Sequence, residues 1–170
     1  RLAMRWQSSV LCLLLLSASA AHGAPWSDAL RQQVERIDRD SPGALGVYVK
    51  RLDGGETFSY GAERFWYLGS TVKVPIAIAV LAQIDAGKLR LADSVTLADT
   101  DKIEAGQVVW SKSGTPFTID ELLKRMLGDS DNTAANMLIR LVGEDRMNEI
   151  AKSAMGSNGL ERITTLAQVR

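Results

Sequence analysis

The stretch GSTVKVP (residues 69–75) and the apolar run IAIAVLAQI (residues 76–84) decide the fold of this chain. From residue 71 to about residue 86 the side chains are apolar almost all round, which is typical of a buried helix. Gly87 is a common residue at the end of a helix. Pro75 falls near the first turn, where a missing N–H costs little. The sequence therefore predicts one buried helix that begins just after the serine of the first stretch.

Ser70 and Lys73 lie three residues apart, and residues at this spacing share one face of a helix. They lie where the unpaired N–H groups and the positive end of the helix dipole are expected. Burial and this positive potential would both lower the pKa of the Lys73 amine, so that the neutral amine could take a proton from the Ser70 hydroxyl. Taken alone, the pattern also fits a serine cap followed by a solvated lysine.

The composition indicates an ordinary globular domain. The chain has 170 residues, of which 46% are hydrophobic and 24% are charged, and this suits one domain with a real core. The formal net charge is zero. A balanced charge gives no indication of nucleic acid or of an anionic membrane surface as a partner.

Residues 1–24 follow the pattern of a secretory signal peptide. A positively charged start precedes an apolar run at 10–16, which is too short to span a bilayer, and small residues follow at 17–24. We therefore expect a periplasmic or secreted protein with no stable membrane anchor after cleavage. Residues 25–170 would then form the functional domain. An uncleaved N-terminal anchor is the alternative interpretation.

Cys12 and His22 are the only cysteine and the only histidine of the chain, and both lie in the signal-like segment. Cleavage at its end removes both residues. A Ser-His-Asp triad, a Cys-His pair and a zinc site with cysteine or histidine ligands are thereby excluded, and we expect neither a metal nor a cofactor. Lysine is the natural base that remains for a nucleophilic serine, which favours the catalytic interpretation of Ser70 and Lys73.

The pattern of apolar residues and turn signals predicts an α+β arrangement around the central helix. The expected elements are an amphipathic helix at 26–39, antiparallel strands at 45–51 and 56–60 joined by a turn at 53–55, a short strand at 94–97, a helix after Thr118, and helices at 132–142 and 144–154. Thr118 and Glu121 have the spacing of a capping box. We expect a loop-rich passage at 98–116, and residues 160–170 have no clear assignment.

Ser130-Asp131-Asn132 lies at the sharp junction between two of these helices. Such a junction can project a hydroxyl and an amide into one cleft. All three residue types are also strong N-caps. For Asp131 the capping role is preferred, because its carboxylate can hold the turn through backbone hydrogen bonds. For Ser130 and Asn132 the capping role is less favoured, because Ser70 and Lys73 could share a site with them.

The two motifs resemble the class A β-lactamase family and its penicillin-binding relatives. The matching residues are Ser70-Thr71-Val72-Lys73 and Ser130-Asp131-Asn132, in the family's order, with similar flanks at 80–87 and 132–138. The resemblance runs from about residue 26 to residue 156. It implies the β-lactamase/DD-peptidase-like α+β fold, in which an antiparallel sheet packs with helices beside an all-helical region.

The resemblance also implies a role for each matching residue. Ser70 would attack the carbonyl of a β-lactam or a peptide-like amide and form an acyl-enzyme, with Lys73 helping to deprotonate it. Ser130 would pass a proton to the leaving nitrogen, and Asn132 would bind the substrate's side-chain amide. The Ser70 backbone N–H would supply half of the oxyanion hole. The expected partner is a small β-lactam or a cell-wall peptide, bound by a monomer.

Two parts of the family pattern are missing from the sequence. No Lys-Thr-Gly motif follows Asn132 and no later strands are predicted, so we expect an incomplete sheet in a domain truncated at its C-terminus. The deacylating glutamate is expected where Thr164-Thr165-Leu166-Ala167 stands, and Glu161 is a poor substitute for it. We therefore expect the chain alone to be unstable and a poor catalyst.

Three functions remain open at this point. The first is a β-lactam hydrolase with a role in antibiotic resistance. The second is a penicillin-binding D-alanyl-D-alanine peptidase or an esterase relative, on which a penicillin adduct would be long-lived. The third is an inactive periplasmic remnant, which would form no acyl adduct although it is folded.

Overall fold

The structure is a computed structural model that describes residues 25–155 together with Ile163 and Leu166. The signal peptide predicted at 1–24 and the prediction made for Glu161 lie outside these residues. Among the described helices, none is long and apolar enough to cross a bilayer. The chain divides into two compact units at the boundary between Arg64 and Phe65.

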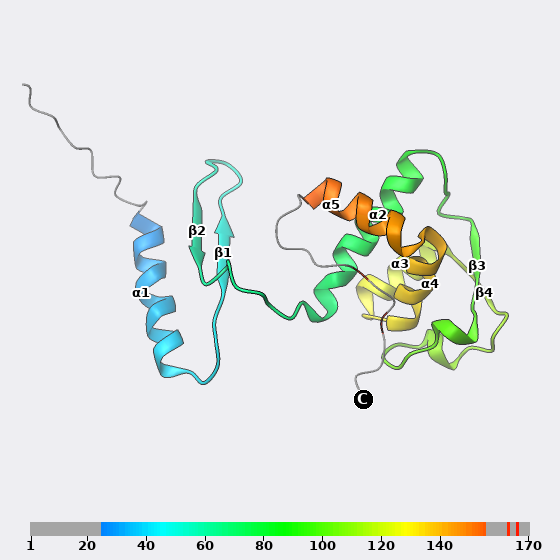
Figure 1. The fold of residues 1–170 in the computed structure, drawn as a ribbon, viewed down its shortest axis with the longest axis horizontal. Helices are drawn as coiled ribbons and strands as arrows, with labels where there is room; N and C mark the ends of the chain where they lie inside the picture. Colours follow the sequence, from blue (N-terminus) through cyan, green and yellow to red (C-terminus); the bar gives the residue numbers. More distant parts are fainter. Residues whose placement is uncertain (1–24, 156–162, 164–165, 167–170) are drawn as a thin grey trace, which may run out of the picture. The chain divides into compact units, whose positions relative to one another are not determined.

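The first unit consists of one helix and a hairpin, labelled in Figure 1 as α1 (Pro25–Asp40), β1 (Val47–Lys50) and β2 (Thr57–Tyr60). The two strands pair antiparallel with Val47 opposite Tyr60, as predicted. Val34 of α1 and Phe58 of β2 are both buried. The Tyr60 hydroxyl donates to the Asp38 carboxylate at 2.6 Å, so a polar contact also ties the helix to the hairpin.

The second unit contains the remaining elements. In chain order they are a 3₁₀ turn (Gly69–Val72), α2 (Lys73–Asp85), β3 (Ser94–Thr96), two further 3₁₀ turns (Asp99–Asp101 and Val108–Trp110), β4 (Pro116–Thr118), α3 (Ile119–Gly128), α4 (Asn132–Val142) and α5 (Glu144–Met155). The predicted helices and strands are confirmed with small shifts at their ends. The strand β4 was not predicted, and it pairs antiparallel with β3. Thr118 and Glu121 form the predicted capping box at the start of α3.

Helix α2 is the centre of the second unit and packs against α4 and α5 (Figure 1). Its residues Ile76, Ala79 and Val80 are fully buried. Val74 and Leu81 are instead 53% and 45% exposed. The prediction of a helix buried almost all round is therefore right for the face toward α4 and α5 and wrong for the face that carries these two residues.

Gly87 ends α2, as predicted, and the geometry shows why a glycine stands there. Its φ angle is +69°, in the left-handed region that favours glycine. The Gly87 N–H donates to the Ile84 carbonyl and the Lys88 N–H donates to the Gln83 carbonyl, each at 2.9 Å. This pair of bonds is the Schellman motif, which satisfies the last carbonyls of a helix.

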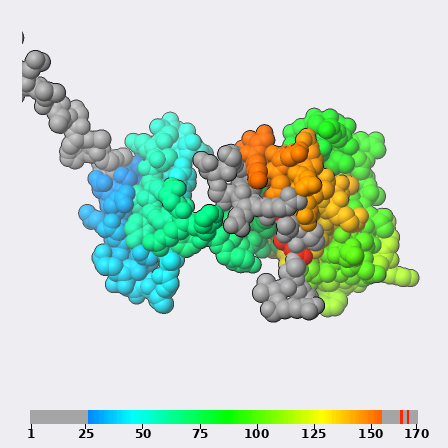
Figure 2. All heavy atoms as spheres, viewed as in Figure 1, coloured from blue at the N-terminus to red at the C-terminus, as the bar shows by residue number. Residues whose placement is uncertain are grey.

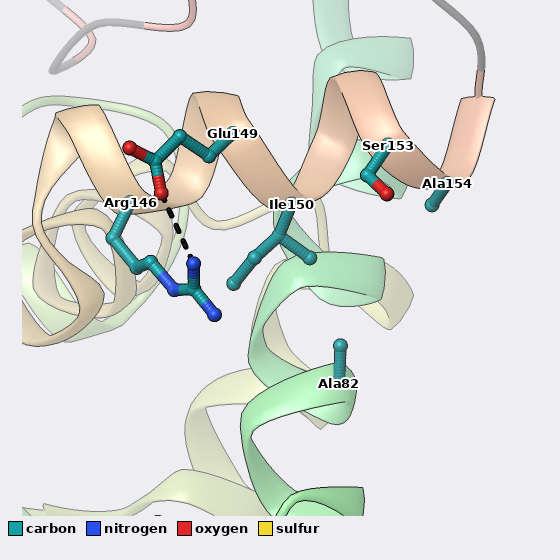
Figure 3. Close-up of a pocket in the computed structure, with 6 residues that line it drawn as sticks. All are labelled: Ala82, Arg146, Glu149, Ile150, Ser153 and Ala154. Carbon is teal, nitrogen blue, oxygen red and sulfur yellow. Dashed lines mark hydrogen bonds and ion pairs between the residues drawn. The ribbon is translucent and has the colours of Figure 1, made fainter.

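A hollow of about 280 Å³ lies between α2 and α5, lined by Ala82, Arg146, Glu149, Ile150, Ser153 and Ala154. Ala82 and Ile150 point toward each other across it, and Arg146 pairs with Glu149 at 3.0 Å on its rim (Figure 3). Helix α5, coloured orange, is visible at the surface of this unit (Figure 2). The lining includes none of the residues that the sequence motifs single out, so this hollow is not the predicted catalytic site.

Candidate active site

The structure brings all four predicted site residues into one cluster. The Lys73 Nζ lies 3.3 Å from the Ser70 Oγ, 2.8 Å from the Ser130 Oγ and 2.6 Å from the Asn132 Oδ1. The Ser130 hydroxyl donates to the Ser70 Oγ at 2.8 Å, across 60 positions of sequence. The two motifs therefore meet in space and form a single hydrogen-bonded site.

The start of α2 gives Ser70 and Lys73 opposite environments. Ser70 lies in the 3₁₀ turn before the helix and its side chain is exposed. Lys73 is the first residue of α2 and is only 3% exposed. The Thr71 N–H and hydroxyl both donate to the Leu68 carbonyl, which holds the turn between them. The hydroxyl is thus open to a substrate while the amine beside it is shielded from water.

Asp131 holds the junction that carries Ser130 and Asn132. Its carboxylate is buried and accepts the Ala134 N–H and the Val108 N–H, each at 2.9 Å. The first bond caps α4, as predicted, and the second fastens the 3₁₀ turn at 108–110 to the junction. Asp131 therefore fixes the backbone from which its two neighbours project.

Ser130 contributes its carbonyl as well as its hydroxyl to the site. Its φ angle is +57°, which is uncommon for a residue other than glycine. The Lys73 Nζ donates to the Ser130 carbonyl oxygen at 2.5 Å. Strained backbone of this kind is often found at functional sites, and here it coincides with a carbonyl bound by the buried amine.

Two backbone carbonyls that the sequence did not reveal fix the orientation of Asn132. The Asn132 Nδ2 donates to the Glu104 carbonyl at 3.1 Å, and the Asn132 N–H donates to the Ala105 carbonyl at 2.9 Å. A carbonyl can only accept, so the NH₂ end of the amide must face Glu104 and the Oδ1 end is left for Lys73. No side-chain pattern could have indicated this, because the groups involved are main-chain atoms.

The contacts of Lys73 suit a neutral amine. Burial lowers the pKa of Lys73, as predicted, while the charge of the nearby Asp131 carboxylate opposes that shift. The Ser130 carbonyl and the Asn132 Oδ1 can only accept, so they use two amine hydrogens. A neutral amine then has its lone pair left for the hydroxyls of Ser70 and Ser130, from either of which it can accept a proton.

A substitution at Gly106 is expected to disrupt this junction. A Cβ atom at this position would lie 2.1 Å from the Asp131 Oδ2, and the φ angle of +112° is unfavourable for any other residue. We expect Gly106→Ala to lower the free energy of unfolding by about 3 kcal/mol, measured by denaturant titration. Gly114→Ala is the matched control, because φ is +92° there but nothing lies within 4 Å of the added Cβ. Equal losses in the two variants would contradict the role given to the Asp131 contact.

The fold and this cluster define a class of protein. An exposed serine, a buried lysine in place of histidine and a second serine between them are typical of serine hydrolases that use lysine as the base. The model of the β-lactamase enzyme family matches residues 29–169, so the chain belongs to the β-lactamase enzyme family. The resemblance stated from the sequence motifs is thereby confirmed.

Individual relatives agree with this assignment. A β-lactamase of Rhodobacter capsulatus is 33% identical over 133 residues, which are 78% of this chain and 45% of that protein. The solved structure of PBP-A is 28% identical with a TM-score of 0.74, over 81% of this chain and 53% of that one. A leucine-to-glutamate mutant of PBP-A, solved as an acyl-enzyme complex with penicillin G, is 30% identical with a TM-score of 0.67. The match covers 72% of this chain and 47% of that one.

These comparisons also confirm the predicted fold class, since the solved neighbours include PBP-A and an ancestral class A β-lactamase. The relatives named above include a protein called a β-lactamase, in agreement with the family that the motifs resemble. The chain spans about half the length of the relatives it matches.

Proposed function

We propose that the protein is a serine hydrolase that reacts with β-lactams to form an acyl-enzyme at Ser70. The observation that carries the proposal is the hydrogen-bonded set of Ser70, Lys73 and Ser130, in which each polar atom lies within 3.3 Å of the next. A nucleophile with its base in hydrogen-bond reach is the requirement for covalent catalysis. Asn132 would bind the substrate's amide beside them.

The distances favour a path for the proton through Ser130. The direct separation of Lys73 from Ser70 is 3.3 Å, whereas both steps through the Ser130 hydroxyl are 2.8 Å, and proton transfer needs about 2.6–3.2 Å. For this path the Ser130 hydroxyl must turn its hydrogen from Ser70 toward Lys73, because a hydroxyl has only one hydrogen. As the Ser70 Oγ bonds to the carbonyl carbon, its proton then passes to the Ser130 Oγ, which gives its own to Lys73. When the C–N bond breaks, Ser130 protonates the leaving nitrogen and Lys73 returns a proton to Ser130.

Residue 166 favours slow release of the acyl group. The Asn136 side chain binds both backbone groups of Leu166, accepting its N–H at 2.7 Å and donating to its carbonyl at 3.1 Å. Asn136 lies one helical turn beyond Asn132 on α4 and so shares its face. The side chain at 166 therefore starts near the catalytic cluster, and a leucine there cannot activate water. This supports a penicillin-binding peptidase as the second candidate function.

The pH dependence of acylation would report the state of Lys73. Burial lowers the pKa of this amine, and only its neutral form can accept a proton. The acylation rate is expected to rise with pH, with a midpoint below the ordinary lysine value of 10.5. Stopped-flow measurement of acylation by a chromogenic cephalosporin from pH 6 to about pH 10 would check this. A rate that falls as the pH rises through this range, with the protein folded, would contradict lysine as the base.

The kinetics of product formation distinguish the two candidate functions. With a chromogenic cephalosporin we expect a burst of about one equivalent of product followed by slow turnover, because acylation is supported by the cluster and deacylation lacks a base. Sustained fast turnover would favour the β-lactam hydrolase. Release of D-alanine from a peptide ending in D-alanyl-D-alanine would favour the peptidase. A folded protein that shows no burst and no D-alanine release would refute both candidate functions.

We also propose that the protein acts outside the cytoplasm. Support comes from the positive start, the apolar run at 10–16 and the small residues at 17–24. N-terminal sequencing of the protein recovered from its host should find a chain that begins near residue 25. Recovery of the uncleaved chain from the cytoplasm would refute the proposal.

A further inference from the structure

Arg140 lies in the last turn of α4, at the opposite end of that helix from Asn132. Its Nε and Nη2 donate to the two carboxylate oxygens of Asp101 at 2.8 and 2.9 Å. Its Nη2 also donates to the Thr96 carbonyl at 2.7 Å. The Asp101 side chain is only 3% exposed, whereas that of Arg140 is 44% exposed. The guanidinium therefore holds a buried carboxylate by two parallel bonds, which fix both the distance and the angle between the two groups.

Asp101 fixes the start of the segment that leads to the catalytic cluster. Besides the bonds from Arg140, its carboxylate accepts the Ala98 N–H at 2.8 Å. Its backbone carbonyl accepts a hydrogen bond from the Asn136 Nδ2 at 3.1 Å. Residues 102–107 lie outside any helix or strand, so no regular ladder of backbone bonds sets their path. Their path depends instead on individual contacts of this kind.

Helix α4 binds this segment directly as it approaches Asn132. The Thr133 hydroxyl accepts the Ile103 N–H at 3.1 Å and donates to the Ile103 carbonyl at 2.9 Å. The next two carbonyls, of Glu104 and Ala105, are the ones that orient Asn132. The Asn132 Nδ2 thus keeps one hydrogen on Glu104 and has the second available for a carbonyl of the substrate. A shift of this segment would therefore change the direction of the hydrogen that meets the substrate.

The segment includes an unfavourable backbone conformation that its neighbours must hold in place. Ala105 has a φ angle of +81°, which is uncommon for a residue other than glycine. Such a conformation persists only where the surrounding contacts determine it. On one side Asp131 binds the Val108 N–H, and on the other side Arg140 binds Asp101. A buried charge that loses its partner is strongly destabilising, so without Arg140 residue 101 would move toward solvent and the backbone at Ala105 could relax.

We propose that Arg140 is a positioning residue for the recognition of the substrate's side-chain amide, which acts through Asp101 and residues 102–105 to hold Asn132 in place. The inference rests on the proposed function, since it needs a β-lactam that acylates Ser70. It predicts that Arg140 affects the choice among β-lactams. A β-lactam with a side-chain amide depends on Asn132 and should react more slowly without Arg140, whereas a β-lactam that lacks this amide should react as before.

The test is the acylation rate of Arg140→Met with two penicillins, timed by mass spectrometry. Benzylpenicillin carries the side-chain amide, and 6-aminopenicillanic acid has a free amine in its place. We expect the rate with benzylpenicillin to fall by about tenfold, because a small misplacement of a group that contacts the substrate is costly, while the rate with 6-aminopenicillanic acid changes by less than about twofold. Arg90→Met is the matched control and should change neither rate, because Arg90 forms an exposed ion pair with Asp93 at 2.9 Å.

The ratio of the two rates separates positioning from a purely structural role. An equal loss with both penicillins, or no loss with either, would overturn the inference. A parent protein that does not prefer benzylpenicillin would overturn it as well, since Asn132 would then not recognise the amide. In an Asn132→Ala background, Arg140→Met should not lower the ratio further, because the two residues act on the same contact. A further loss there would contradict the path through Asn132.

Arg140→Lys provides a second variant with a milder change. Lysine keeps the charge that faces Asp101 but cannot reproduce the planar fork that also reaches the Thr96 carbonyl. Its ratio should lie between those of the parent and of Arg140→Met. If Arg140→Met does not fold, Arg140→Lys decides the question, and a ratio equal to that of the parent would overturn the inference. No adduct on the parent protein with either penicillin would instead refute the proposed function, so the two failures can be told apart.

Discussion

Replacement of Lys73 by methionine is expected to slow the acylation of Ser70 by about a thousandfold, or about 4 kcal/mol of activation free energy. The amine is the only group in the cluster that can take up a proton at neutral pH, because its other members are hydroxyls, an amide and a carbonyl. Methionine has a similar length and suits a buried site, so the shape of the site is largely kept. The rate of adduct formation with benzylpenicillin, followed by mass spectrometry, measures the effect.

A second lysine supplies the control for this substitution. Lys124 lies on α3 in an exposed ion pair with Asp120, and Lys124→Met should leave the acylation rate unchanged. The melting temperature of each variant should be recorded, because Lys73→Met leaves two buried acceptors without a donor. If a folded Lys73→Met variant is acylated at nearly the parent rate, lysine is not the base.

Leu166→Glu is expected to shorten the life of the penicillin adduct by about a hundredfold or more, since general base catalysis typically contributes about 10²–10⁴. The Asn136 amide, one helical turn beyond Asn132, holds the backbone of residue 166, so a carboxylate at 166 would start from a backbone anchored beside the cluster. The acylation rate should change little, because Lys73 and Ser130 are untouched. The decay of the adduct after removal of free penicillin is the measurement.

Leu166→Gln is the matched control for that change. Glutamine has the size and polarity of glutamate but cannot accept a proton from water, so its adduct should persist like that of the parent. Equal acceleration by glutamine and glutamate would mean that the leucine only excludes water. No acceleration by either would show that residue 166 does not reach the acyl group.

The elements that local chemistry decides were predictable from the sequence. The end of α2 follows from the φ angle that Gly87 can adopt, and the start of α3 follows from the Thr118 and Glu121 capping box. In α4 and α5 apolar residues recur at helical spacing over enough positions to predict both helices from the sequence. Side-chain types and spacing also singled out Ser70, Lys73, Ser130 and Asn132, which the structure brings into one hydrogen-bonded cluster.

The features that depend on long-range contacts could not be predicted. Strand β4 is three residues long and exists because it pairs with β3. The exposure of Val74 and Leu81 depends on what packs around α2, which periodicity does not contain. The backbone carbonyls that orient Asn132 and the Thr96 carbonyl that Arg140 binds are main-chain atoms, which every residue has.

The central claim is that Ser70 is the nucleophile of an acyl-enzyme, and one measurement tests it most directly. The folded protein is treated with benzylpenicillin, digested, and mapped by tandem mass spectrometry, with Ser70→Ala treated in parallel. The account predicts one penicilloyl group, carried by Ser70 and absent from the Ser70→Ala variant. A folded protein that acquires no adduct, or an adduct that persists in Ser70→Ala, would contradict it.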